Sequence, residues 1–275
     1  MIEVLLSVTV LMILTLFLTL VFNAMQATSS FWGRRIDAET QARRVLDRLG
    51  DDVARMVFRP DVDLALTLAP GDDAMRFFSQ VEGHAAAGAS GPSRGISVVE
   101  YRTNVKGQLE RGARSLQFDQ LVFAPLDREP SPDFPVALVD GPTNSVPPLE
   151  NTYFDLLGDQ ILRFEIGFLL AGGASGQLPR LAAQLPAETK TKDILAVIVA
   201  VATLDTSARV PLSAEKIAAL AAALPDYTEA HANAGQDILA VWSSILRNGD
   251  LTAIPGIPKT SAQSVRVFQR YYSLQ

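Results

Sequence analysis

The longest hydrophobic pattern lies near the start of the chain. Residues 4–22 read VLLSVTVLMILTLFLTLVF, in which 15 of 19 positions are apolar, and no ionisable side chain occurs between Glu3 and Arg34. At about 1.5 Å per residue, a helix of this length matches the bilayer hydrocarbon core, about 30 Å. The polar positions do not prevent insertion, because a hydroxyl can bond a backbone carbonyl one turn back; they are Ser7, Thr9, Thr15 and Thr19. The pattern predicts a membrane-spanning helix.

The helical pattern continues beyond this run. No proline occurs over residues 23–58, and apolar residues recur at helical spacing with polar residues on the other face. These apolar positions are Ile36, Ala38, Ala42, Val45, Leu46, Leu49, Val53, Met56 and Val57. We expect Pro60 to end the helix near residue 59, after about 55 residues or about 80 Å, with bends at Gly33 and Gly50. The chain then divides into a membrane half of the helix (1–22), an amphipathic half (23–59) and a globular domain (60–275).

Three interpretations of the apolar run compete. A cleaved secretory signal has a basic start and an apolar part of about 7 to 15 residues, whereas this run is longer and nothing basic precedes it. The second is a plain single-pass anchor. The third is a helix that anchors the chain in the membrane before assembly and forms a filament core afterwards. Glu3 helps to distinguish the plain anchor from the filament-forming helix. A carboxylate beside a hydrophobic helix either lies at the lipid headgroups, as in a plain anchor, or pairs with a cation, as in a filament.

Beyond residue 60 the pattern becomes that of strands. We expect strands at 64–68, 75–81, 96–103, 116–123, 136–139, 161–170, 194–204 and 264–272, helices at 213–224 and 235–247, and loops at 84–95, 129–148 and 171–179. RFEIGF and SVRVFQRYY alternate, which places one face on a core and the other in water. ILAVIVAVATL is nearly continuous and predicts a central strand covered on both faces, on one of them by the long helix. We therefore predict an α+β fold in which a long N-terminal helix packs against an antiparallel, β-rich domain.

Charge and composition exclude some classes of function and of site. The chain has 24 Lys plus Arg and 30 Asp plus Glu, a net charge of −6. Residues 1–60 hold 7 basic and 6 acidic side chains, which leaves 17 and 24, or −7, for the domain. An acidic domain argues against a nucleic-acid partner, which requires a basic surface. The absence of Cys excludes disulfides and Cys-based metal sites.

No residue set indicates catalysis or a bound cofactor. His84 lies in a Gly/Ala loop and His231 in a polar turn, without the neighbours of a metal site, so both are interpreted as solvated histidines. The acidic pairs at 51–52, 61–63 and 72–73 match no calcium-loop pattern and are interpreted as surface charge or turn residues. Trp242 is expected in the core, at helical spacing from Ile238 and Ile245. We assign no catalytic, cofactor-binding or metal-ligating residue.

At residues 2–22, IEVLLSVTVLMILTLFLTLVF, the chain resembles the type IV pilins and the pseudopilins of type II secretion. In those families a basic leader ending in Gly precedes Phe-Thr-Leu, a hydrophobic residue and Glu, which together form the prepilin-type N-terminal methylation motif. Ile2 and Glu3 match its last two positions, while the leader, the Gly and the Phe are missing before Met1. The resemblance implies an assembly role for Glu3. It implies a membrane and filament-core role for Val4, Leu5, Leu6, Val8, Val10, Leu11, Ile13, Leu14, Leu16, Phe17, Leu18, Leu20, Val21 and Phe22.

Two further resemblances refine the subunit type. QARRVLDRLGDDVARMVFRP (41–60) is similar to the helix-to-domain passage of J-type minor pseudopilins. ILRFEIGFLL (161–170), ILAVIVAVATLD (194–205) and VRVFQRYYSL (265–274) resemble Verru_Chthon cassette protein C, a pilin-like family that implies no activity. The large domain is typical of a minor subunit.

The resemblance also implies where the protein acts. It predicts a structural subunit of a type IV pilus or a type II secretion-like filament, single-pass in the inner membrane, with its domain periplasmic or exterior. The partners implied are other pilin or pseudopilin subunits, membrane lipid, and prepilin peptidase if a leader exists upstream of Met1. Arg34 and Arg35 follow the apolar run directly and by the positive-inside rule favour the opposite orientation. The main alternative is a single-pass, membrane-anchored binding protein that does not polymerise. A membrane-tethered enzyme is a second alternative, but it would need a convergent polar site that the sequence does not indicate.

Overall fold

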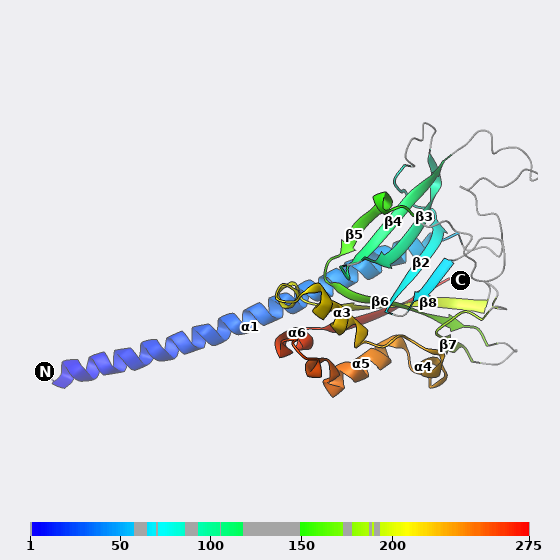
Figure 1. The fold of residues 1–275 in the computed structure, drawn as a ribbon. Helices are drawn as coiled ribbons and strands as arrows, with labels where there is room; N and C mark the ends of the chain where they lie inside the picture. The colour runs from blue at the N-terminus through cyan, green and yellow to red at the C-terminus, as the bar shows by residue number, and fades with distance from the viewer. Residues whose placement is uncertain are drawn as a thin grey trace, which may run out of the picture.

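A computed structural model describes residues 2–57, 65–69, 71–85, 93–104, 106–117, 149–172, 178–186, 189 and 193–274. Its dominant element is α1 (Ile2–Ala54), a single helix of 53 residues, which is about 80 Å long. The first part of α1 projects away from the rest of the protein, and its last part is enclosed by the domain (Figure 1). The expected architecture of a long helix packed against antiparallel sheets is confirmed.

Within the described residues the strands form two antiparallel sheets. Sheet A has the order β1-β2-β3-β4-β5, with β1 (Ala65–Ala69), β2 (Asp72–Ser79), β3 (Ser93–Thr103), β4 (Leu109–Gln117) and β5 (Phe154–Gly158). Sheet B has the order β7-β6-β8-β9, with β6 (Ile161–Leu170), β7 (Arg180–Ala182), β8 (Ile194–Thr203) and β9 (Arg266–Ser273). Because β7 pairs only with residues 168–170 of β6, the rest of that edge of sheet B is left to contact β2 of sheet A.

Short helices lie between β8 and β9 and, in Figure 1, below sheet B. They are α2 (Thr206–Arg209), α3 (Ala214–Ala222), α4 (Glu229–Asn233), α5 (Ile238–Asn248) and α6 (Lys259–Gln263), with the 3₁₀ turn η4 (Asp250–Ala253); a further turn, η2 (Asn151–Tyr153), precedes β5. We call residues 206–263 the helical segment. The predicted helices at 213–224 and 235–247 correspond to α3 and α5.

The two larger apolar clusters among the described residues follow from this arrangement. The first lies between α1 and both sheets and includes Ala42, Val45, Leu46, Leu49 and Val53 of α1, Met75, Phe77 and Val99 of sheet A, and Phe164, Ile166, Val197, Val199 and Val201 of sheet B. The second lies between the other face of sheet B and the helical segment and includes Leu162, Ile198, Ala200, Ala202, Leu220, Ile238, Val241 and Trp242. Successive residues of β8 enter alternate cores, so the prediction of a central strand covered on both faces, with α1 on one, is confirmed.

Some sequence predictions require correction. α1 ends at Ala54 and not near residue 59, because the following backbone joins sheet A: the Val57 amide donates to the Phe78 carbonyl at 2.8 Å and Met56 bridges Ser79. RFEIGF does not place one face in water, because both faces of β6 are covered and nearly all its residues are buried.

The strand expected at 116–123 begins at Leu109 and is described only to Gln117, and β5 and β7 were not expected. The other strands expected at 64–68, 75–81, 96–103, 161–170, 194–204 and 264–272 correspond to β1, β2, β3, β6, β8 and β9. The strand expected at 136–139 and the loop expected at 129–148 lie outside the described residues.

Candidate functional site

The apolar half of α1 is the most unusual surface of the protein. Ile2–Asn23 is long and apolar enough to cross a membrane, with a mean hydropathy of 2.8, and none of that window is buried in the domain. Its predicted membrane and filament-core residues all lie in α1, and every one of them whose side chain is described is 40% to 66% exposed. Contiguous apolar surface of this extent marks a membrane or protein interaction site.

The polar side chains in this half are accommodated by the helix itself. The Ser7 hydroxyl donates to the Val4 carbonyl at 2.9 Å, Thr15 to Leu11 at 2.5 Å and Thr19 to Thr15 at 2.8 Å. The predicted return of hydroxyls to the preceding turn is therefore confirmed for these three residues, and they add no unsatisfied polar group to a hydrocarbon environment.

Glu3 lies in the first turn of α1 and is exposed. A carboxylate in a first turn is stabilised by the positive end of the helix dipole, which is a purely structural reason for its position. The same side chain lines one end of a shallow groove along the helix, whose other members are Leu6, Ser7, Val10, Leu11 and Leu14. The groove places a single anionic group at the edge of an apolar strip.

A buried ion pair fixes the other half of α1 to sheet A. The Asp52 side chain is 0% exposed, and its oxygens accept hydrogen bonds from Arg111 Nε at 2.5 Å, Arg111 Nη2 at 3.0 Å and the Tyr101 hydroxyl at 2.6 Å. Burial and the adjacent Asp52 charge raise the pKa of Tyr101 well above its usual value. The Ser79 hydroxyl donates to the Asp52 backbone carbonyl at 2.8 Å. The interpretation of Asp52 as surface charge is therefore wrong, while Asp51 beside it is exposed.

A second attachment fixes α1 to sheet B. The Tyr272 hydroxyl donates to the Leu46 carbonyl at 2.6 Å, and Arg270 forms an ion pair with Asp47. The Tyr272 ring lies over Gly50, where a Cβ atom would be 3.0 Å from Cε1 of the ring. Gly50 thus allows close approach of β9, and the described contacts explain it without a bend.

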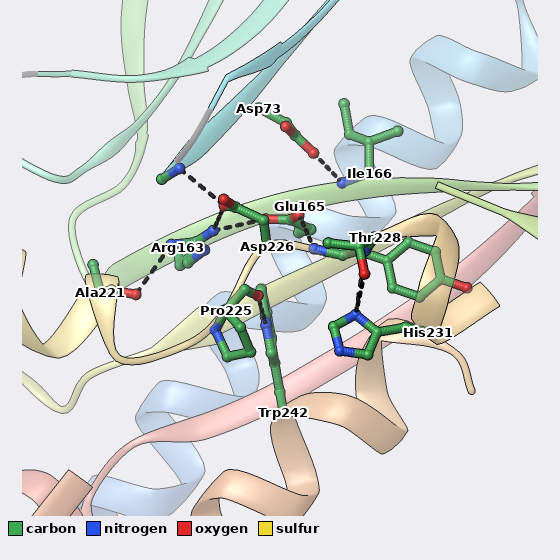
Figure 2. A network of polar contacts seen from close by, with 12 residues as sticks. Asp73, Arg163, Glu165, Ile166, Ala221, Pro225, Asp226, Thr228, His231 and Trp242 are labelled. Atoms are coloured by element: carbon green, nitrogen blue, oxygen red, sulfur yellow. Dashed lines mark hydrogen bonds and ion pairs between the residues drawn. The ribbon is translucent and has the colours of Figure 1, made fainter. Parts of the chain in front are cut away.

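A group of buried carboxyls lies where β2, β6 and the helical segment meet (Figure 2). Asp73 of β2 accepts a hydrogen bond from the Ile166 amide at 2.8 Å, and Glu165 of β6 accepts one from the Tyr227 amide at 2.7 Å. Arg163 donates to Glu165 at 3.2 Å and to Asp226. Asp73 is 4% exposed, so its interpretation as surface charge is also wrong. We call Asp73, Arg163, Glu165 and Asp226 the carboxyl cluster.

The remaining candidate residues have structural partners. His84 Nε2 lies 3.0 Å from an Asp155 oxygen, and both side chains are exposed. His231 is a capping residue of α4 that contacts Thr228 and stacks on Tyr227. Trp242 is fully buried, as predicted, and donates to the Pro225 carbonyl at 2.9 Å. Among the described residues, no group of three or more His, Cys, Asp or Glu could hold a metal ion; Asp61 and Asp63 lie outside them.

Comparisons with known proteins find similar solved structures, including a secretion-system protein and a type IV-like pilin. No family model and no curated protein matches the sequence. One chain of the GspK-GspI-GspJ complex of the type 2 secretion system from enterotoxigenic Escherichia coli is similar at 16% identity and a TM-score of 0.32, over 60% of this chain and 88% of that chain. A type IV-like pilin from Thermus thermophilus is similar at 16% identity and a TM-score of 0.37, over 85% of this chain and 94% of that chain.

Proposed function

We propose that the chain is a structural subunit, of the minor pilin or pseudopilin kind, in a type IV pilus or a type II secretion-like filament, and that it is not an enzyme. One observation carries this proposal. A single continuous helix has one half built into the domain core and the other half exposed, apolar and long enough to span a bilayer.

The exposed half requires a cover in the cell. Leaving a large apolar side chain in water instead of burying it forgoes about 1.5–3 kcal/mol, and this helix exposes many of them. Lipid can supply the cover in the inner membrane, and the apolar helices of other subunits can supply it in a filament. The same helix serves both states, with the domain periplasmic or exterior and Arg34 and Arg35 on its side of the membrane.

Glu3 is proposed as the assembly residue. A carboxylate inside a bundle of apolar helices is costly unless it is paired, and the amino terminus of a neighbouring subunit is a suitable cation. A pair of this kind also penalises wrong register between helices. If a leader exists upstream of Met1, prepilin peptidase would generate the matching amino terminus.

The attachment of α1 to the domain supports the same function. The buried Asp52–Arg111 pair and the Tyr272 contact join the helix to separate sheets. A force that extracts the helix from the bilayer would therefore move the domain with it. An anchored binding protein needs only a tether and has no need for this rigid connection.

The test is Glu3→Ala in the full-length chain, with Ser7→Ala as the matched control. Both positions line the same groove, and the control removes no charge. We expect the Glu3 variant to insert in the membrane and to fold normally, but to be depleted from the sheared filament fraction, whereas the Ser7 variant is incorporated. Normal incorporation of Glu3→Ala contradicts the assembly role. A wild-type chain that remains membrane-bound and never enters a filament supports the alternative, a single-pass binding protein that does not polymerise.

A further inference from the structure

The carboxyl cluster joins three parts of the domain that are distant in sequence. Asp73 connects β2 of sheet A to the Ile166 amide of β6, and Glu165 connects β6 to the Tyr227 amide of the helical segment. Asp226 accepts a hydrogen bond from the Gly71 amide at 2.9 Å, which connects the helical segment back to the β1–β2 turn. Each of the three contacts is a backbone amide held by a carboxyl oxygen.

The charges in this cluster do not balance when all three carboxyls are ionised. Arg163 is the only cation in it, and it is 1% exposed. Asp73 and Glu165 are 4% and 3% exposed, while the Asp226 side chain is 43% exposed. Lys106 lines the same surface cavity as Arg163, but it is itself exposed. Three carboxylates and one guanidinium carry a net charge of −2. Because two of these carboxylates, Asp73 and Glu165, are buried with only one cation, the excess negative charge favours the uptake of protons by them.

We propose that the carboxyl cluster is a proton-dependent latch: protonated Asp73 and Glu165 hold the β1–β2 hairpin and the helical segment against β6, and loss of these protons releases them. The latch is a property of the domain alone and does not depend on whether the chain assembles.

The pKa values of the two buried carboxyls agree with a cluster that is protonated when closed and loses its protons as the pH rises. Burial, reinforced by the Glu165 charge, raises the pKa of Asp73 to about 8, against the opposing effects of the Ile166 amide and Arg163. Burial raises the pKa of Glu165 to about 7, although the Tyr227 amide and Arg163 oppose it. Both carboxyls then gain charge across the neutral range, where Asp226 repels each of them.

Opening is linked to proton release. In the open state the carboxyls reach water and return to their ordinary pKa values, so opening releases protons wherever the closed state still holds them. Each proton released makes the opening constant rise by up to about tenfold per pH unit, between the ordinary pKa and the raised one. The closed form is therefore most favoured below the ordinary pKa values, is weakened progressively as the pH rises towards 7 and 8, and depends little on pH above that range.

The experiment is hydrogen–deuterium exchange of the full-length chain in detergent between pH 6 and pH 8.5, with each rate divided by the intrinsic chemical exchange rate. The reporter amides are Gly71, Ile166 and Tyr227, and those of β8, which contributes no cluster residue, are the internal reference. We expect the opening constant at the reporters to rise with pH relative to β8. Equal pH dependence at the reporters and at β8 overturns the proposal.

Neutral isosteres separate the latch from an ordinary buried network. Asp73→Asn retains a carbonyl oxygen for the Ile166 amide and cannot ionise, so the pH dependence should fall by up to about tenfold per pH unit. Glu165→Gln is the second variant should Asp73→Asn fail to fold, and Asp250→Asn, at an exposed site outside the cluster, is the matched control. Wild-type pH dependence in both cluster variants, or an equal loss in Asp250→Asn, overturns the latch.

Discussion

Substitution of Asp52 by Ala tests how the helix is attached to the domain. In the wild type the Asp52 carboxylate is fully buried and accepts two hydrogen bonds from Arg111 and one from Tyr101. The substitution removes all three and leaves the Arg111 guanidinium, whose side chain is only 10% exposed, without its counter-ion. The expected outcome is a severe loss of stability, with the helix and sheet A separating most easily.

The magnitude follows from the burial of both partners. Removal of one member of a buried ion pair costs about 3–5 kcal/mol, most of it from the charge left behind. The free energy of unfolding of a domain is about 5–15 kcal/mol, so this loss is a large fraction of the total. In Asp52→Ala combined with Arg111→Met no buried charge is left unpaired, because Arg48, which also lies 3.8 Å from Asp52, is 45% exposed. The double variant should therefore be more stable than the sum of the two single changes predicts, by at least about 1 kcal/mol.

The assay is urea unfolding of the full-length chain in a non-ionic detergent, followed by the fluorescence of the buried Trp242. Trp32, the other tryptophan, is replaced by Phe in every variant so that one signal is read. Asp51→Ala is the matched control, because Asp51 is exposed on the same helix and has the same gain in helix propensity. We expect the control to lie within about 0.5 kcal/mol of the wild type.

Equal free energies of unfolding for Asp52→Ala and Asp51→Ala would contradict a stabilising role for the buried pair. Simple additivity in the double variant would also contradict it, because the buried charge pair would then contribute no coupling.

Three further predictions use the same unfolding assay. Gly158→Ala places a Cβ atom 2.5 Å from Cγ1 of Ile161 and should cost about 1–3 kcal/mol; no change would show that the backbone moves freely there. Tyr272→Phe removes the hydroxyl that donates to the Leu46 carbonyl and should lower the free energy of unfolding by about 0.5–1.5 kcal/mol. An unchanged midpoint of urea unfolding would show that this hydrogen bond does not stabilise the domain. Because the pKa of Asp73 is raised from 3.8 to about 8, its contribution to stability is complete below pH 3.8 and lost as the pH rises towards 8, by up to about 1.4 kcal/mol per pH unit. Asp73→Asn should reduce the pH dependence of the free energy of unfolding. A pH dependence identical to that of the wild type would contradict a contribution from Asp73.

The elements predicted best were those with a regular hydrophobic pattern. β6 matches its expected bounds and β8 differs from them by one residue, because an alternating pattern in β6 and a nearly continuous apolar run in β8 both predict strands. α1 was predicted from its apolar run and helical spacing, apart from its last turn. That turn is lost to pairing with β2, a long-range contact that local sequence does not encode.

β4 shows why polar strands were missed. It reads LERGARSLQ, with two charged residues followed by Gly and, two positions later, one more Arg, and this composition is typical of a surface loop. Its position between β3 and β5 and the contact of Arg111 with Asp52 hold it in the sheet. Both causes are tertiary, so propensity alone could not have found it.

The positions of the buried acidic residues in the hydrophobic pattern could have indicated that they are buried. Asp52 follows Leu49 by three positions and Val45 by seven, which places it on the buried stripe of α1. Asp73 shares the parity of Met75 and Phe77 along β2, which places it on the buried face. A charge in phase with an apolar stripe predicts a buried partner. The identity of that partner, on another sheet, required the structure.

Photocross-linking from the exposed apolar half of α1 in the native host tests filament assembly through this helix most directly. A photoreactive phenylalanine derivative replaces Leu16, which is 66% exposed, and in a control chain replaces Leu178 on the domain. We predict adducts from position 16 that mass spectrometry identifies as a second copy or another subunit with an N-terminal apolar helix. Because assembly of such filaments needs an ATPase, these adducts should disappear when the host's assembly ATPase is deleted, and position 178 should not form them. Adducts with lipid alone, unchanged by the deletion, would contradict assembly through this helix.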